Sequence, residues 1–269
     1  MASEFVETAA EAAHRVGELL MKMLPETRGN KEIRTKRNPA DLVTRADRMS
    51  EELIVALLRE RFPDHAILAE EGTRHPGAEY RWIIDPVDGT TNFAHGLPLF
   101  CVSIGLERQG RMVAGVVYHP PMDELFWAHR GQGAHLRRGT SDQKLTVSEV
   151  GSVAQAVVAT GLPYDIRASG TNIANIDALC RTAIEVRILG AAALHLAYVA
   201  AGRLEAFWEP ALNPWDLAAG ALLVEEAGGR ITHMRGSPFH LNVGDVLATN
   251  ARVHDEMVGL LRTERSAAG

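Results

Sequence analysis

Apolar residues near the amino terminus recur every three to four positions, which is the spacing of a helix with one buried face. Over Phe5–Met23 this pattern predicts an amphipathic helix. A second helix is predicted to begin at Thr44, which stands three residues before Asp47 as in a capping box, and to end at Arg61. Two short apolar runs that each end in an acidic residue predict buried strands at Ala66–Ala69 and Arg81–Ile84.

Between residues 99 and 136 the pattern changes to short strand-like runs. The runs Cys101–Arg108, Met112–Tyr118, Glu124–His129 and Ala134–Arg137 are separated by turns rich in Gly and Pro. Strands this close together leave no room for crossover helices, so we expect an antiparallel meander rather than βαβ units.

After residue 141 strand-like and helix-like runs alternate, which favours an α/β arrangement. No Pro-, Gly- or Ser-rich linker separates the two halves, so we expect one compact unit over residues 1–269 with two lobes, about 1–140 (α+β) and about 141–269 (α/β). The strands expected here are Ala156–Thr160, Val186–Leu189, Glu205–Trp208, Arg230–Thr232 and Val246–Ala248. The helices expected here are Ala168–Thr182, Ala191–Ala200, Asp216–Ala227 and Ala251–Arg262.

Composition excludes several classes of protein. With 46% hydrophobic and 23% charged residues, the chain is too apolar for disorder. A net charge of −6 argues against a nucleic-acid partner, and the absence of eighteen consecutive apolar residues argues against a membrane span. The two cysteines, Cys101 and Cys180, form neither a CxxC pair nor a disulfide framework, so we expect a reducing cytoplasm.

The segment Trp82–Phe93, WIIDPVDGTTNF, concentrates the groups that carry chemistry. An apolar strand delivers Asp85 to its carboxyl end, and we expect Pro86 to stop the sheet ladder there. Asp85 and Asp88, three residues apart in a turn, can both face a hard cation, with the carbonyl of Val87 as a third oxygen ligand.

The Gly89-Thr90-Thr91 sequence that follows is expected to begin a helix whose free N–H groups favour a phosphate. A cation site beside an anion site is the layout that phosphoryl transfer requires. An Asp-Pro turn with a helix cap is the alternative explanation of the same residues.

Three further acids are candidates for the same cation and phosphate site. Glu70 ends the first of the two strands, and Asp216 follows Pro214-Trp215 at the start of a helix. Taken singly, Glu70 is also typical of a solvated strand end, Asp216 of a helix N-cap and Asp47 of a capping box.

The residues Asp85–Phe93 together with Trp215–Gly220 resemble the paired signature of the inositol monophosphatase family. The segments Asn38–Asp47 and Leu68–Gly72 resemble two upstream segments of the family in the same order. The resemblance covers about residues 32 to 250 of the chain. It implies an αβαβα layered fold, a homodimer and a lithium-sensitive phosphomonoesterase that uses two or three Mg²⁺ ions per active site.

The resemblance also implies roles for individual residues. Metal ligands would be Glu70, Asp85, the Val87 carbonyl, Asp88 and Asp216. Glu70, Thr90 and Asp47 would surround the attacking water. Contacts to the substrate would come from Asp88, Gly89, Thr90, Ala192, Glu209 and Lys36. The chain departs from the family at Ala191, where a hydroxyl residue is common, and at Gly161-Leu162-Pro163, both on the leaving-group side.

The function expected from this resemblance is hydrolysis of a small phosphomonoester, with myo-inositol 1-phosphate as the first candidate. Histidinol phosphate and fructose 1,6-bisphosphate are alternatives for the same chemistry. A non-catalytic, metal-dependent interaction module is an alternative from another class, although such a module would not need to retain all five acids.

Overall fold

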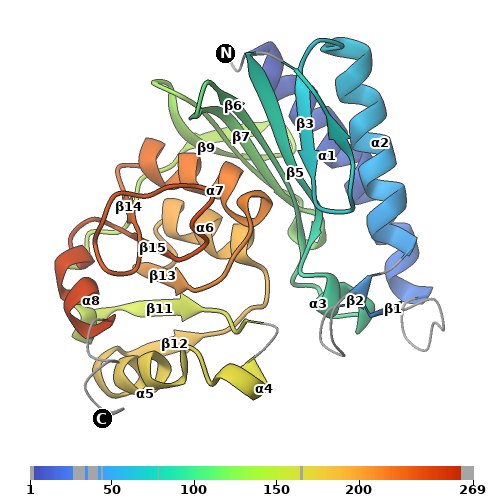
Figure 1. The fold of residues 1–269 in the computed structure, drawn as a ribbon. Coiled ribbons are helices and arrows are strands. Elements are labelled where there is room, and N and C mark those ends of the chain that lie inside the picture. The colour runs from blue at the N-terminus through green and yellow to red at the C-terminus, as the bar shows by residue number, and fades with distance from the viewer. Residues whose placement is uncertain are drawn as a thin grey trace.

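The chain folds into five layers in the order αβαβα, as the sequence resemblance implies (Figure 1). The structure is a computed structural model and describes residues 3–26, 34–35, 42–43, 45–77, 79–163 and 166–261. The outer layer on one side consists of α1 (Glu4–Met23) and α2 (Arg45–Arg61). The bounds of α1 and of α2 each agree with the predicted helices to within one residue. Thr44, the predicted start of the second helix, lies outside the described residues.

The first sheet is an antiparallel meander extended by one parallel strand, as the short runs predict. Its strand order is β10-β9-β8-β7-β6-β5-β3-β4, and only β3 and β5 run parallel. The strands are β3 (Ala66–Ala69), β4 (Arg74–His75), β5 (Tyr80–Asp88), β6 (Cys101–Arg108), β7 (Arg111–His119), β8 (Glu124–His129), β9 (Gly133–Arg138) and β10 (Ser141–Lys144). A separate two-stranded sheet pairs β1 (Arg34–Thr35) with β2 (Leu42–Val43).

The second sheet is mixed, with order β12-β11-β13-β15-β14. The first three strands of that order are parallel, and β15 and β14 are antiparallel to their neighbours. Its strands are β11 (Val157–Thr160), β12 (Glu185–Arg187), β13 (Ala206–Glu209), β14 (Arg230–Thr232) and β15 (Val246–Thr249). The last helical layer, α5 (Ile173–Thr182) and α8 (His254–Leu261), covers its outer face.

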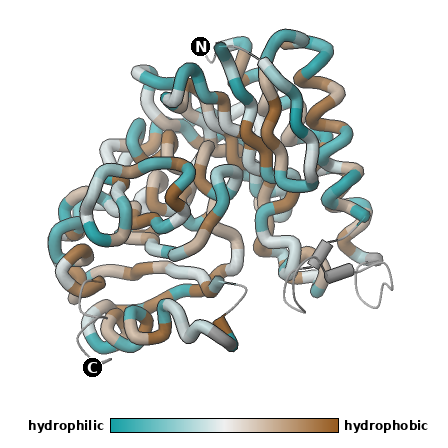
Figure 2. The backbone as a smooth tube through the Cα atoms, in the orientation of Figure 1, coloured by the Kyte–Doolittle hydropathy of each residue, from teal (hydrophilic) through white to brown (hydrophobic). Residues whose placement is uncertain are grey.

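The central layer, α6 (Ala192–Ala200) and α7 (Pro214–Glu226), lies between the two sheets. Every residue of α7 from Leu217 to Val224 is buried, as expected for a helix that is apolar all round. By contrast, α2 alternates hydrophilic and hydrophobic stretches because only one of its faces is buried (Figure 2). On β7, a Cβ at Gly115 would lie 2.9 Å from the Ala219 carbonyl oxygen, so glycine there lets α7 approach the sheet closely.

Pro86 does not end β5, contrary to the expectation from sequence. The strand continues to Asp88 through a change of register: Asp85 pairs with Ser103 and Asp88 with Cys101. Two residues of β5, Pro86 and Val87, therefore stand opposite the single residue between those partners. A proline lacks the N–H of a ladder bond, and a bulge is one of the few places in a sheet that tolerates its absence.

The helix expected over Ala168–Thr182 is also interrupted. The structure has a short α4 (Ile166–Ser169) followed by α5, and between them Gly170 has φ +62° and Asn172 has φ +78°. Left-handed backbone cannot continue a right-handed helix, so the chain turns at these two residues. The apolar spacing supports a helix only from Ile173 onward, so the prediction placed the start of this helix too early.

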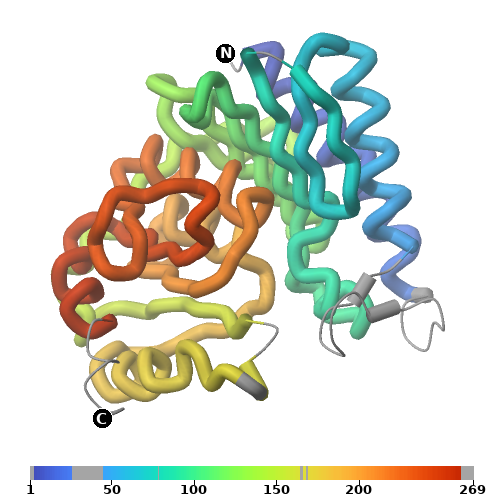
Figure 3. The backbone as a smooth tube through the Cα atoms, in the orientation of Figure 1, coloured from blue at the N-terminus to red at the C-terminus, as the bar shows by residue number. Residues whose placement is uncertain are grey.

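Figure 3 shows that the first and second halves of the chain lie side by side, with the two termini at opposite ends of the molecule. In the described part of the chain, no helix combines the length and apolar character that a membrane crossing demands.

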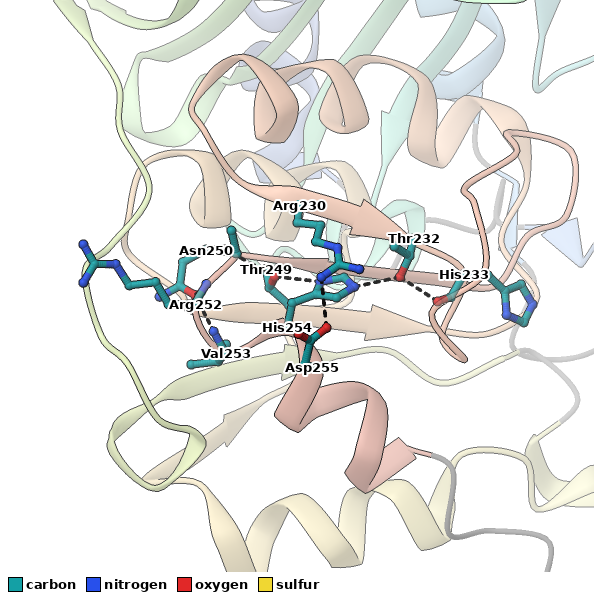
Figure 4. Close-up of polar contacts among 10 residues, drawn as sticks. Arg230, Thr232, His233, Thr249, Asn250, Arg252, Val253, His254 and Asp255 are labelled. Atoms are coloured by element: carbon teal, nitrogen blue, oxygen red, sulfur yellow. Dashed lines mark hydrogen bonds and ion pairs between the residues drawn. The ribbon is translucent and has the colours of Figure 1, made fainter.

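A buried histidine fixes the start of α8 against the second sheet (Figure 4). The Thr232 hydroxyl donates to the His233 carbonyl at 2.8 Å, so at 3.0 Å it accepts from the Nε2–H of His254. The Thr249 hydroxyl lies 2.9 Å from Nδ1 of His254 and therefore donates to it. This arrangement satisfies both ring nitrogens of the neutral imidazole.

We expect this histidine to make the fold acid-sensitive. Burial is the main cause that lowers the pKa of His254 from 6.5 to about 4. In the unfolded chain His254 therefore binds a proton near pH 6.5, whereas in the folded chain it does so only near pH 4. As the pH falls from about 6.5 to about 4, the free energy of unfolding should decrease by up to about 1.4 kcal/mol per pH unit. Urea unfolding from pH 7.5 to pH 4.5 should give a smaller loss for His254→Gln; equal slopes would contradict this role.

Candidate active site

The parallel pairing of β3 and β5 brings the acids that follow these strands to one edge of the first sheet. Glu70 comes directly after β3, and its N–H donates to the Ile84 carbonyl at 3.1 Å. Asp85 and Asp88 flank the bulge of β5. The backbone therefore brings Glu70 and the acids of β5 to the same end of the two parallel strands.

Hydrogen bonds at the end of β5 link Asp85, Val87 and Thr90 to one another and to α2. Oδ1 of Asp85 accepts from the Val87 N–H at 3.0 Å. Oγ1 of Thr90 lies 3.0 Å from the Val87 carbonyl oxygen and 3.2 Å from Oδ1 of Asp47 on α2. Gly89, with φ +92°, precedes α3 (Thr90–Ala94), the helix that the Gly89-Thr90-Thr91 sequence predicts.

Asp88 is held by the other half of the chain. Its carboxylate accepts from the N–H groups of Ala192 at 3.0 Å, Ala193 at 2.8 Å and Leu194 at 3.4 Å, in the first turn of α6. The thiol of buried Cys101 donates to Oδ2 at 3.3 Å. Negative charge is favoured at a helix N-terminus, so α6 fixes the orientation of Asp88.

Asp216 is not the N-cap of its helix, although an acid in that position is typical of one. Asn213 is the N-cap of α7, and Asp216, three residues later, accepts from the Asn213 N–H at 2.7 Å. This is the carboxylate half of a capping box, which fixes Asp216 in the first turn of α7.

These carboxyl groups repel one another. Burial and the charges of Glu70, Asp88 and Asp216 raise the pKa of Asp85 well above its ordinary value. Burial, with a further contribution from Asp88, raises the pKa of Asp216 to about 8. Burial also raises the pKa of Asp88, to about 6, although the Cys101 thiol and the α6 N–H groups oppose the rise. A nearby cation would relieve this repulsion.

Carboxylate and carbonyl oxygens are the hard ligands that Mg²⁺ prefers, so the donor set fits this ion. As the side chains stand in the described ranges, no three His, Cys, Asp or Glu residues are arranged to hold a metal. The oxygens of Asp88 are turned to the α6 N–H and Cys101 thiol groups. The metal ligation by Glu70, Asp85, Val87, Asp88 and Asp216 therefore stays a prediction.

A pocket of about 660 Å³ opens in front of the cluster. Its acidic side includes Glu70, Asp88, Glu209 and Asp216. Its other predicted lining residues are Gly89, Thr90 and Ala192, and its apolar side includes Leu162, Ile188 and Leu212. Most of the residues that the sequence assigns to one site thus share one pocket, while Lys36 lies outside the described residues.

Glu209, at the end of β13, is buried in the pocket wall. Burial and the charges of Asp216 and Asp88 raise its pKa well above the ordinary value. A Cβ at Gly161 would lie 2.1 Å from both carboxyl oxygens of Glu209, so Gly161 must lack a side chain for Glu209 to occupy this place. The place of Glu209 in the pocket wall therefore depends on the absence of a side chain at residue 161.

Sequence reasoning missed two residues of the site. The Cys101 contact with Asp88 follows from the register of β5 and β6, which no local pattern specifies. Glu51 lies one helical turn after Asp47 on α2, and its buried carboxylate bonds the turn that carries Glu70. In sequence, Glu51 could have been found from its spacing of four residues from Asp47, which places both acids on the same face of the predicted helix.

Comparison with known proteins is consistent with this geometry. Residues 1–266 match the inositol monophosphatase family. The inositol-1-monophosphatase of Mesorhizobium japonicum is 40% identical over 268 residues, 98% of this chain and 98% of its own length. The Nus factor SuhB of Pseudomonas aeruginosa is 42% identical over 255 residues, 91% of this chain and 90% of its own. The crystal structure of the extragenic suppressor protein suhB from Bartonella henselae superposes with a TM-score of 0.90 at 38% identity, covering 97% of this chain and 100% of its own.

Proposed function

Because this chain belongs to the inositol monophosphatase family and is a phosphatase, we propose that it hydrolyses a small polyol phosphomonoester with the help of Mg²⁺. The first candidate substrate is myo-inositol 1-phosphate. The observation that carries the proposal is the pocket that Glu70, Asp88 and Asp216 share with the first residues of α3. Mutually repelling acids beside a helix N-terminus suit a divalent cation and a phosphate together.

The residues on the β3–β5 edge would carry out the reaction. Mg²⁺, when bound, supplies positive charge that stabilises the phosphate and favours ionisation of water. Glu70 and the hydrogen-bonded pair of Thr90 and Asp47 would orient the attacking water and accept its proton. The N–H groups of Gly89 and Thr90 would bind the phosphate oxygens. Metal ligands would be Glu70, Asp85, the Val87 carbonyl, Asp88 and Asp216.

Another part of the pocket lining would bind the alcohol. Glu209 is buried in that lining, and the hydrogen bonds found among the described residues include none to its carboxyl group, which leaves it available to substrate hydroxyls. The apolar side chains of Leu162, Ile188 and Leu212 would exclude water from the leaving group. Histidinol phosphate and fructose 1,6-bisphosphate are the other substrates that this chemistry admits.

A phosphate-release screen tests the proposal. About twenty phosphomonoesters, including the three named above, would be incubated with the protein in Mg²⁺, in EDTA, and in Mg²⁺ with Li⁺. We expect turnover of a polyol phosphate in Mg²⁺, loss of turnover in EDTA, and inhibition by Li⁺ as in the family. Full turnover in EDTA would refute the metal-dependent mechanism, and hydrolysis of none of the esters would refute the proposed substrate class.

Replacing Glu209 should change selectivity more than chemistry. Loss of a charged hydrogen-bond partner costs about 1.5–3 kcal/mol, so Glu209→Ala should lower kcat/KM for a polyol phosphate by about ten- to a hundred-fold. The loss for an aryl phosphate without hydroxyls should be much smaller, and Glu209→Gln should restore part of the difference. Equal losses on both substrates would show that Glu209 does not bind the alcohol.

We further propose that the protein works as a homodimer in the cytoplasm, as the family resemblance implies. Both cysteines are free in the structure, Cys101 buried and Cys180 exposed, and a reducing compartment would keep them so. Size-exclusion chromatography with light scattering tests the dimer: a single species of about 29 kDa, the mass of one chain, would contradict it.

A second candidate function is a role in transcription, which the name of the P. aeruginosa relative, Nus factor SuhB, favours. Such a role requires a surface rather than turnover. In a strain that depends on this chain, an inactive variant such as Asp85→Asn should preserve a transcription phenotype and abolish a phosphatase phenotype. Loss of both together would argue against a separate role.

A further inference from the structure

The turn that carries Glu70 is bonded to a buried acid on α2. This turn, Glu70–Thr73, joins β3 to β4. Glu51 on α2, only 4% exposed, accepts from the Glu71 N–H at 2.7 Å, from the Thr73 N–H at 3.0 Å and from the Thr73 hydroxyl at 2.5 Å. All three donors lie one or three residues beyond Glu70, so a single carboxylate fixes the turn on both sides of its apex.

Glu70 needs such an anchor because its neighbours repel it. The charge of Glu70 and a hydrogen bond between the two side chains are among the causes that raise the pKa of Asp85, so Glu70 stands against Asp85 and is repelled by it whenever both carboxyl groups are ionised. The backbone resists through two bonds, Glu70 N–H to the Ile84 carbonyl and Ala69 N–H to the Thr73 carbonyl, both 3.1 Å. Bonds from N–H groups to a buried carboxylate are stronger than neutral ones.

The position of Glu51 also couples the turn to the rest of the site. Asp47 stands four residues earlier on α2, is equally buried, and contacts Thr90 at 3.2 Å. Residues four apart lie on the same helix face, and α2 packs against β5. One rigid helix therefore sets the place of Thr90 through Asp47 and the place of Glu70 through Glu51.

We propose that Glu51 is a positioning residue that holds Glu70 in the place from which it serves the metal and the attacking water. This inference rests on the proposed function and extends it to a residue outside the pocket. Among the described residues, Glu51 is not part of the pocket lining, and its carboxylate reaches the site through its hydrogen bonds to the Glu70–Thr73 turn.

Magnesium binding to the metal-free protein tests this role without relying on turnover. Glu51→Gln keeps the shape of the side chain, but its amide NH₂ cannot accept a bond, so the turn loses one or more of its three bonds. We expect calorimetric titration with Mg²⁺ to give a dissociation constant about tenfold higher or more than that of the parent. The rise in melting temperature that Mg²⁺ causes should shrink accordingly. The control is Glu52→Gln, the same change at the exposed neighbouring position, which should leave both quantities unchanged.

The outcomes separate positioning from simple stabilisation. A Glu51→Gln protein that melts earlier without metal yet binds Mg²⁺ with parental affinity would overturn the proposal. If Glu51→Gln does not fold, Thr73→Val decides, because it removes only the hydroxyl bond. It should raise the dissociation constant about two- to tenfold, and parental affinity there would likewise overturn the proposal. Absence of Mg²⁺ binding in the parent would instead refute the proposed function itself.

Discussion

Asp85→Asn is expected to lower kcat/KM by several orders of magnitude while leaving the metal-free protein as stable as the parent or slightly more stable. Asp85 is one of the acids that we assign to the metal site, and it is repelled by the other three, so its loss should remove much of the charge that binds the cation. The asparagine fits the same space, and its Oδ1 can still accept from the Val87 N–H. At the same time it removes a buried charge that Glu70, Asp88 and Asp216 repel.

Initial rates and thermal melting with and without Mg²⁺ check this prediction. Saturating Mg²⁺ should raise the melting temperature of the parent and raise that of Asp85→Asn less. Asp64→Asn makes the same change at an exposed acid and should be silent in both assays. If Asp85→Asn unfolds without metal while its folded fraction keeps parental turnover, Asp85 is a structural turn residue and the proposed site is wrong.

Glu124→Ala should destabilise the fold by about 1.5–3 kcal/mol, the cost of losing hydrogen bonds between a buried carboxylate and charged partners. Glu124 at the start of β8 is fully buried and accepts two bonds of 2.7 Å from Arg203, in the turn after α6, and a further bond from Arg138. Burial acts to raise the pKa of Glu124, but the bonds from Arg203 and Arg138 outweigh it, so the pKa lies below its ordinary value. Arg203 would be left beside β8 without its partner.

The pair of Arg130 and Glu225 provides a matched control, because it also joins the first sheet region to the central helices. These side chains are 2.8 Å apart but about one third exposed. An exposed pair contributes about 0–1 kcal/mol, so Glu225→Ala should have a small effect. Urea unfolding of both variants at pH 7 is the measurement. A loss below 1 kcal/mol for Glu124→Ala would show that Arg203 finds another partner or water.

The sequence by itself determined the elements and the chemistry of the acids. Local spacing of apolar residues placed α1, the end of α2 and the meander strands within a few residues, because each element buries a face that its own sequence specifies. It failed where backbone conformation overrides the pattern. A bulge carries β5 past Pro86, and left-handed residues split α4 from α5.

The motif around Asp85 and Asp88 also predicts a cation site from sequence alone, because two acids three residues apart at the end of an apolar strand can face one ion. Sequence did not reveal which groups hold these acids in place. Asp88 is bonded by Ala192, 104 residues away, and the place of Glu209 depends on a missing side chain at Gly161. Such contacts depend on how the layers stack rather than on any local preference.

Glu51 is the clearest example of a residue whose role depends on the tertiary structure rather than on the local sequence. In sequence it is one acid among several on a polar helix, and only its spacing of four residues from Asp47 sets it apart from Glu52. Only the packing of α2 against β5 buries Glu51 and leaves Glu52 exposed, and only the turn after β3 supplies the donors that satisfy its charge. A buried carboxylate persists only where a fold provides hydrogen bonds for it, and those donors lie twenty residues away along the chain.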